Sequence, residues 1–177
     1  MVLVRDAFAD KGLPTLTFNY AYTESGRGRP DRPDRLLAVH ASAAERMSSY
    51  VDRIVLAGKS MGGRMASHLV GDRGAEAAAL VYFGYPLVPI GKGEPRSWDH
   101  LVRIREPQLF VAGTRDRLSP PDVMADVVKA LPQAELVVVD DADHSFRVPK
   151  RTGRTSDEVL TELVDQSVGW LAANRLL

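Results

Sequence analysis

The chain has 177 residues, a length typical of one domain that buries its own core, and we treat residues 1–177 as a single domain. Lys and Arg together number 23, as do Asp and Glu, so no net charge attracts nucleic acid or an anionic membrane as a partner. The chain contains no cysteine, which excludes disulfide bonds and thiolate chemistry.

The start of the chain is charged rather than continuously apolar. Arg5 and Asp6 interrupt its first apolar residues, so neither a signal peptide nor a membrane-spanning segment is predicted there. A cytoplasmic location is the simplest expectation. A net charge near zero favours self-association, which makes a homodimer a candidate state.

The first elements alternate between helical and strand-like patterns. Apolar residues at helical spacing predict a helix over 2–11, which Gly12 ends. The run TLTFNY predicts a strand over 15–20, and a surface loop rich in Gly, Pro and charge follows over 23–35. Helical spacing returns over 35–50.

The rest of the chain continues this alternation. Four further apolar runs predict strands, at 54–57, 77–85, 108–113 and 135–140. Helices are predicted between or after them, from Ser60 to about Val70, over 122–131 and over 156–177. Alternating strands and helices predict a parallel sheet with helices on both faces. We therefore expect an α/β fold of three α/β/α layers, with a mostly parallel sheet of about five strands.

Residues 58–62 read Gly-Lys-Ser-Met-Gly and match the pattern G-x-S-x-G between a predicted strand and a predicted helix. In this arrangement a sharp turn lifts the hydroxyl of Ser60 above the edge of the sheet. Gly58 and Gly62 are expected to let the strand and the helix approach each other closely. The amide of Met61 would lie at a helix N-terminus, where it can donate to a developing oxyanion. The pattern thus predicts that Ser60 is a nucleophile.

Other roles compete for this glycine-rich turn. Ser60 could serve only as a helix N-cap, which is common for serine. A phosphate-binding loop is excluded, because Arg53 stands where the first glycine of G-x-x-x-x-G-K-[ST] is required. A dinucleotide-binding fingerprint is not present either, since Gly26 and Gly28 lead to Pro30 rather than to a glycine-opened helix.

A serine nucleophile needs an adjacent base, and the base needs an acid that fixes its tautomer. Of the four histidines, only His144 lies in a loop after a late strand. Asp116 follows the preceding strand and is the expected acid. Asp140, Asp141 and Asp143 are alternatives, although they share the loop of His144 and suit turns there. No second well-spaced histidine supports a metal site in this loop, so no metal is expected.

Four motifs recur in this order in one group of proteins: GKSMGGRMAS, GYPL, a strand ending in G-x-x-D, and DHSF. On these motifs the chain resembles the α/β-hydrolase superfamily over nearly its whole length. More narrowly, it is similar to small, lidless proteins related to dienelactone hydrolases and to the histone-acetyltransferase NSL-complex subunit. The resemblance implies an α/β-hydrolase fold and a serine hydrolase activity. Ser60 departs from dienelactone hydrolases themselves, which use cysteine.

The resemblance also implies an earlier strand, which ends in a His-Gly turn and supplies a second oxyanion donor. No His-Gly segment precedes residue 2, and the family places this strand between those matched here by 15–20 and 54–57. We therefore expect an N-terminally shortened fold. A late start of the sequence, direct pairing of the flanking strands, or a strand from another chain would each account for it. Loss of one donor costs about 10²- to 10³-fold in turnover, so weak or absent activity is expected.

Substrate-binding residues are expected at the sheet edge where ligands bind in open α/β folds. The candidates are Asn19 and Tyr20 at the end of the first predicted strand, Tyr85 at the end of another, and Lys59 beside Ser60.

The leading hypothesis is an acyl hydrolase that acts on a small-molecule ester or thioester and needs no cofactor. The competing hypothesis is a non-catalytic or weakly active interaction module on the same scaffold.

Overall fold

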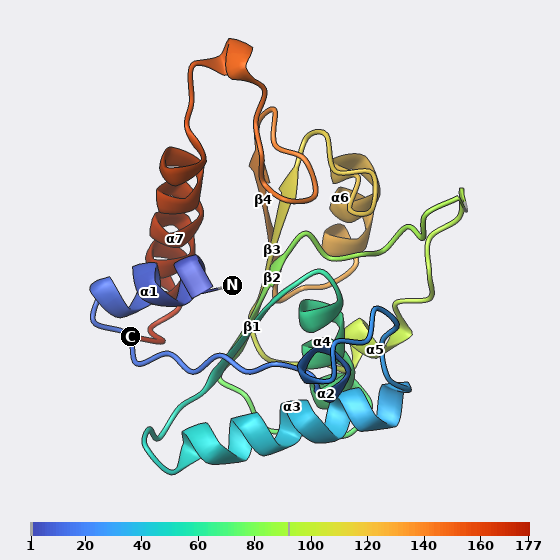
Figure 1. The fold of residues 1–177 in the computed structure, drawn as a ribbon, viewed down its shortest axis with the longest axis vertical. Helices are drawn as coiled ribbons and strands as arrows, with labels where there is room; N and C mark the ends of the chain where they lie inside the picture. Colours follow the sequence, from blue (N-terminus) through green and yellow to red (C-terminus); the bar gives the residue numbers. More distant parts are fainter. Residues whose placement is uncertain (1, 92) are drawn as a thin grey trace.

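A parallel sheet of four strands forms the centre of the computed structural model, which describes residues 2–91 and 93–177 (Figure 1). The strands are β1 (Val55–Lys59), β2 (Ala79–Phe83), β3 (Gln108–Gly113) and β4 (Ala134–Val139), and they lie side by side in this order. The register pairs Lys59 with Phe83, Phe83 with Val111, and Val111 with Val137. The carboxyl ends of all four strands therefore meet at one edge of the sheet.

Helices cover both faces of the sheet (Figure 1). They are α1 (Val2–Asp10), α2 (Ala21–Glu24), α3 (Pro33–Ser48), α4 (Met61–Gly71), α5 (Asp99–Val102), α6 (Pro121–Lys129), the short 3-10 helix η1 (Lys150–Thr152) and α7 (Ser156–Ala173). The side chains of α1 and α7 form one apolar core with the sheet, and those of α3 to α6 form the other. The expected three-layer α/β/α fold is thus confirmed. No helix within the described residues is both long and apolar enough to span a membrane.

The burial of each strand follows from its place in the sheet. Every residue of β2 and β3 is buried, as their continuous apolar sequences predict for strands covered on both faces. The polar exception, Gln108, accepts a hydrogen bond from the Tyr82 hydroxyl at 3.0 Å and donates to the carbonyl of Leu101 at 3.3 Å. By contrast, β1 lies at the edge of the sheet, and Ala57 in its middle is exposed.

The predicted strand over 15–20 is wrong, so the sheet has four strands among the described residues rather than five. A strand needs a neighbour that pairs with its backbone. Within the described residues, β1 pairs only with β2, and the backbone from Pro14 to Asn19 makes no hydrogen bond. A cavity of about 410 Å³ lies between this extended segment, α1 and β1. The apolar sequence therefore has strand propensity, but no partner strand converts it into a strand.

The other elements agree with the sequence to within a few residues at their ends. The predicted helix over 156–177 is α7, which ends at Ala173. Its N-cap is Thr155, whose hydroxyl accepts from the amide of Glu158, and the carboxylate of Glu158 accepts from the amide of Thr155. This reciprocal capping box satisfies two amides that no helical carbonyl can reach. The terminal helix is thereby fixed directly after the loop that carries His144.

Candidate active site

Ser60 occupies a sharp turn between β1 and α4. Its φ is 52° and its ψ is −121°, a backbone conformation that residues with a side chain rarely adopt. The turn is held by two backbone hydrogen bonds, from the Ser60 amide to the Phe83 carbonyl at 2.9 Å and from the Arg64 amide to the Ser60 carbonyl at 3.1 Å. Such strain persists only where the surrounding structure enforces it, and it is concentrated at functional sites.

Two glycines make this turn possible, and one of them is not the glycine that the motif indicates. A Cβ on Gly58 would lie 2.3 Å from the amide nitrogen of Gly63, so strand and helix touch through these two residues. A Cβ on Gly62 would meet nothing within 4 Å. The expectation that Gly62 permits the close approach is therefore wrong: residue 62 faces away from β1, and residue 63 faces it.

Asp116 and His144 complete a chain of hydrogen bonds to Ser60. Asp116 follows β3 and is 2% exposed, and its Oδ2 lies 2.8 Å from Nδ1 of His144. Nε2 of His144 lies 2.9 Å from the Oγ of Ser60. With a proton on Nδ1 donated to the carboxylate, Nε2 is free to accept the hydroxyl proton of Ser60. The structure thus brings together the three side chains that the sequence singles out, and two successive hydrogen bonds connect them.

The carboxylate of Asp116 is anchored by its own loop. Its second oxygen, Oδ1, accepts hydrogen bonds from the amides of Leu118 at 2.9 Å and Ser119 at 3.1 Å. These donors hold a buried charge in one orientation, with its other oxygen aimed at His144. The fixed carboxylate of Asp116 therefore determines the orientation of the His144 imidazole.

The alternative acids form other interactions. Asp140 accepts from the hydroxyl of Thr114, and Asp141 pairs with Arg151. Asp143 accepts from the amides of Ser145 at 2.8 Å and Arg147 at 3.0 Å, and so closes the turn around His144. These carboxylates shape the loop, and Asp116 is the carboxylate that bonds to the imidazole. The described residues contain no group of three or more His, Asp or Glu side chains with the spacing of a metal site.

Met61 is the first residue of α4. The first amides of an α-helix have no carbonyl partner within the helix, and they carry the positive end of its dipole. The Met61 amide directly follows Ser60, and its role as an oxyanion donor stays a prediction.

Lys59 directly precedes Ser60 in sequence, but it lines a cavity whose lining does not include Ser60. This cavity of about 430 Å³ lies between α1 and α7 and is lined also by Val4, Phe83 and Leu163. Burial lowers the pKa of Lys59, although Asp116 and Asp143 act in the opposite direction. The side chain thus belongs to the α1 and α7 side of the sheet.

Asn19 and Tyr20 interact with residues near α2 and α3. The Asn19 side chain donates to the carboxylate of Glu24 at 2.6 Å, and the Tyr20 hydroxyl lies 3.3 Å from Nδ1 of His40. Burial raises the pKa of Tyr20 to about 12. The structure gives neither side chain a hydrogen bond to Ser60 or His144.

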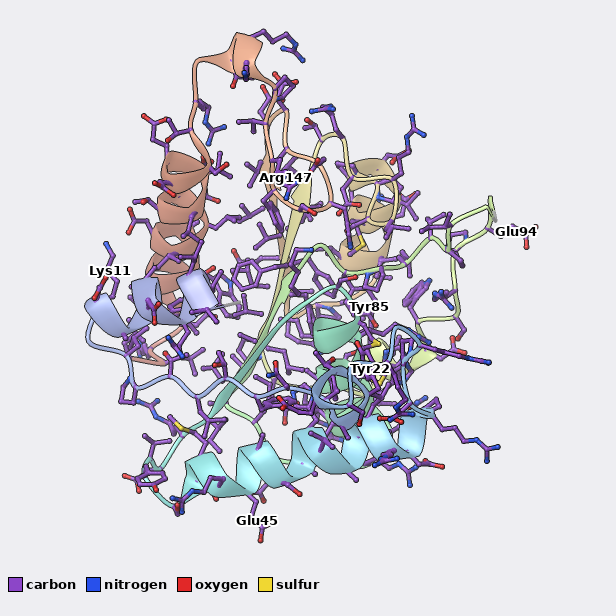
Figure 2. All side chains as sticks on the ribbon, viewed as in Figure 1. Lys11, Tyr22, Glu45, Tyr85, Glu94 and Arg147 are labelled. Atoms are coloured by element: carbon purple, nitrogen blue, oxygen red, sulfur yellow. The ribbon has the colours of Figure 1, made fainter. Side chains whose placement is uncertain are left out.

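Tyr85 is buried in the core, where Figure 2 shows it beside α4. Its hydroxyl lies 3.0 Å from both the Oγ of Ser67 and Nε2 of His100, and those two atoms are also 3.0 Å apart. Because Ser67 donates to the carbonyl of Arg64, it can accept from the other two groups. The triangle ties the end of β2 to α4 and α5, and the Tyr85 hydroxyl finds its hydrogen-bond partners within the core.

Two buried histidines link the stability of the fold to pH. Burial lowers the pKa of His40 and of His100 from 6.5 to about 4. Between these pH values the unfolded chain binds protons that the folded chain does not bind, so stability falls as the pH falls. The stability that these groups contribute is complete above pH 6.5 and is lost toward pH 4.

We expect the free energy of unfolding to drop by roughly 2 kcal/mol for each of these histidines between pH 7 and pH 4.5. Urea denaturation at the two pH values measures this drop. His100→Gln removes one titrating group and keeps a hydrogen-bonding side chain, so its drop should be smaller than that of the wild type by about 2 kcal/mol. An equal drop in the two proteins would contradict the lowered pKa of His100 as a cause of the pH dependence.

The sequence predicts a substrate site at this edge of the sheet, but it did not single out most of the residues that line the hollow beside His144. Its volume is about 640 Å³, and it is formed by the loops that follow β2, β3 and β4. Its lining residues are Val88, Pro89, Ile90, Gly91, Gly93, Arg115, Arg117, Leu118, Asp143, His144 and Ser145. Ile90 is 87% exposed. The sequence feature that could have identified these residues is their place in loops after predicted strands, because such loops all leave the same edge of a parallel sheet.

A family model described as "Alpha/beta hydrolase domain" matches residues 1–172, which is nearly the whole chain. The match includes Ser60, Asp116 and His144 and the elements that hold them.

Solved structures with this fold come from several bacteria. An α/β serine hydrolase homologue from Coxiella burnetii is 23% identical with a TM-score of 0.71, and the match covers 93% of this chain and 74% of that one. A lidless α/β serine hydrolase from Xanthomonas campestris is 19% identical with a TM-score of 0.70, over 96% and 72% of the two chains. Est1E from Butyrivibrio proteoclasticus, solved with ferulic acid bound, is 17% identical with a TM-score of 0.70, over 97% and 82%. These similarities show the shared fold.

Proposed function

Because the chain belongs to the alpha/beta hydrolase domain family, we propose that it is a serine hydrolase that cleaves a small ester or thioester. The observation that carries the proposal is the hydrogen-bonded series Ser60, His144 and Asp116, with distances of 2.9 Å and 2.8 Å. Ser60 lies in a strained turn that directs its hydroxyl at a base. The serine hydrolases with the same fold support this class of reaction.

The reaction proceeds through an acyl-enzyme. The Oγ of Ser60 attacks the carbonyl carbon while Nε2 of His144 takes the hydroxyl proton, and Asp116 stabilises the imidazolium. The Met61 amide donates to the oxyanion of the tetrahedral intermediate. His144 then gives its proton to the departing alcohol or thiol. A water molecule, deprotonated by His144, attacks the acyl group and releases the acid, and the proton returns to Ser60.

The hollow beside His144 suits a small apolar acyl or alcohol group. Val88, Ile90 and Leu118 give it apolar walls, and His144 also lines it. The proposed substrate is therefore a small-molecule ester or thioester, and the chemistry requires no cofactor. A cytoplasmic location and a homodimer remain predictions from composition.

Hydrolysis of p-nitrophenyl acetate and of an acetyl thioester tests the proposal. The wild type should turn over at least one of them, and Ser60→Ala should lose nearly all of that turnover. Ser49→Ala, at an exposed serine at the end of α3, should retain wild-type turnover. Absence of turnover in the folded wild type would favour the competing function, an interaction module on a hydrolase scaffold.

A further inference from the structure

Gly84 lies where the ends of three strands meet. Its amide donates to the carbonyl of Val111 on β3 at 2.8 Å, and the carbonyl of the preceding Phe83 accepts from the Ser60 amide at 2.9 Å. Its φ is +62°, in the left-handed region that favours glycine. The backbone is thus held on both sides, and the direction in which a side chain would project is fixed.

A side chain at this position would project at the contact between Asp116 and His144. A Cβ would lie 3.0 Å from Oδ2 of Asp116 and 3.2 Å from Nδ1 of His144, the two atoms that share the 2.8 Å hydrogen bond. Few Cβ atoms come this close to a neighbour, so one of the two partners would have to give way by a few tenths of an ångström. Asp116 is fixed by the amides of Leu118 and Ser119, which makes His144 the partner that yields. Its shift would also disturb the contact of Nε2 with Ser60.

This crowding separates Gly84 from glycines that only form turns. Five other described glycines also have a positive φ, and a Cβ on any of them would meet nothing within 4 Å: Gly12, Gly26, Gly74, Gly91 and Gly153. Conformational freedom therefore explains those glycines. At Gly84 the missing side chain also leaves space that the Asp116–His144 pair occupies.

We propose that Gly84 is a positioning residue of the serine hydrolase site: it has no side chain, so that Asp116 and His144 can meet directly above its Cα. The assignment rests on the proposed function for its effect on turnover. Gly84 does not touch the reacting atoms, and it acts through the placement of the imidazole. The hydrogen bond between His144 and Asp116 can be observed by NMR, because its Nδ1 proton is expected to resonate far downfield.

The test compares Gly84→Ala with Gly74→Ala, which introduces a Cβ at a similar φ of +68° but meets nothing. Both variants should lose a similar amount of stability through backbone strain. Gly84→Ala should lower kcat for p-nitrophenyl acetate by about 10- to 100-fold with little change in KM, because the base is displaced. It should also shift or abolish the downfield His144 resonance. Gly74→Ala should keep both kcat and the resonance.

Asparagine variants keep the test decisive if alanine prevents folding at position 84. Asparagine tolerates a positive φ better than alanine, so Gly84→Asn reduces the strain and retains the Cβ. It should show the same loss of kcat and the same change in the resonance, whereas Gly74→Asn should show neither. If both Gly84 variants fail to fold while both Gly74 variants fold, Gly84 is a determinant of folding, and the positioning role is overturned.

The outcomes also separate this proposal from the proposed function. A wild-type protein without turnover would contradict the hydrolase, and the downfield resonance would still report whether Gly84 controls the His144–Asp116 contact. An active wild type, together with a Gly84→Ala variant of unchanged kcat and unchanged resonance, would overturn the role of Gly84 and leave the hydrolase intact.

Discussion

Replacement of His144 by alanine is expected to lower turnover of an activated ester by about 10⁶-fold, because His144 is the one side chain among the described residues that forms a hydrogen bond with the Ser60 hydroxyl. Asp116→Asn should cost less, about 10⁴-fold, since it preserves the shape of the site but favours the wrong imidazole tautomer. Steady-state kinetics with p-nitrophenyl acetate measures both losses as decreases in kcat.

A matched control separates this role from a general loss of histidine. His68 lies on α4, where it pairs with Asp72. Its ring stacks on that of His100, with the two ring centroids 3.8 Å apart. His68→Ala should therefore leave kcat near the wild-type value. A His144→Ala variant that retained most of the wild-type turnover would show that another base serves Ser60.

The second large effect is expected at the contact of β1 with α4. A Cβ on Gly58 would lie 2.3 Å from the amide nitrogen of Gly63 and 2.5 Å from the carbonyl carbon of Gly62, and backbone atoms cannot move aside as flexible side chains do. Gly58→Ala should therefore cost about 3 kcal/mol or more of stability, enough to threaten folding of the whole domain. Urea denaturation, or the soluble yield if the variant does not fold, measures this effect.

Gly62→Ala is the matched control within the same motif. Its Cβ meets nothing within 4 Å, and residue 62 lies in the first turn of α4. Because alanine is a better helix former than glycine, this variant should be as stable as the wild type or more stable by up to about 1 kcal/mol. Equal destabilisation by the two substitutions would contradict the difference between Gly58 and Gly62.

The sequence predicts the layers of this fold well because they depend on local patterns. The fully apolar runs of β2 and β3, and the helical spacing of α3 and α7, each identify an element without knowledge of its neighbours. The order of Ser60, Asp116 and His144 after successive strands is also a linear property of the chain. The parallel register then brings these residues to one edge of the sheet.

Other features depend on tertiary contacts that a linear pattern does not contain. Segment 15–20 has the composition of a strand, yet strand formation depends on a partner for its backbone. Tyr85 follows a strand as a pocket residue would, but its hydroxyl is satisfied within the core by Ser67 and His100. Likewise, the roles of Gly63 and Gly84 arise from segments far from them in sequence or across the turn.

Ser60 as a nucleophile activated by His144 and Asp116 can be tested by a chemical probe. Such a test is reaction with a fluorophosphonate, followed by mass spectrometry of the proteolysed protein. We predict one adduct on the peptide that contains Ser60, much slower labelling in His144→Ala, and none in Ser60→Ala. A folded wild-type protein that remains unlabelled, or an adduct on another serine, would contradict this role of Ser60.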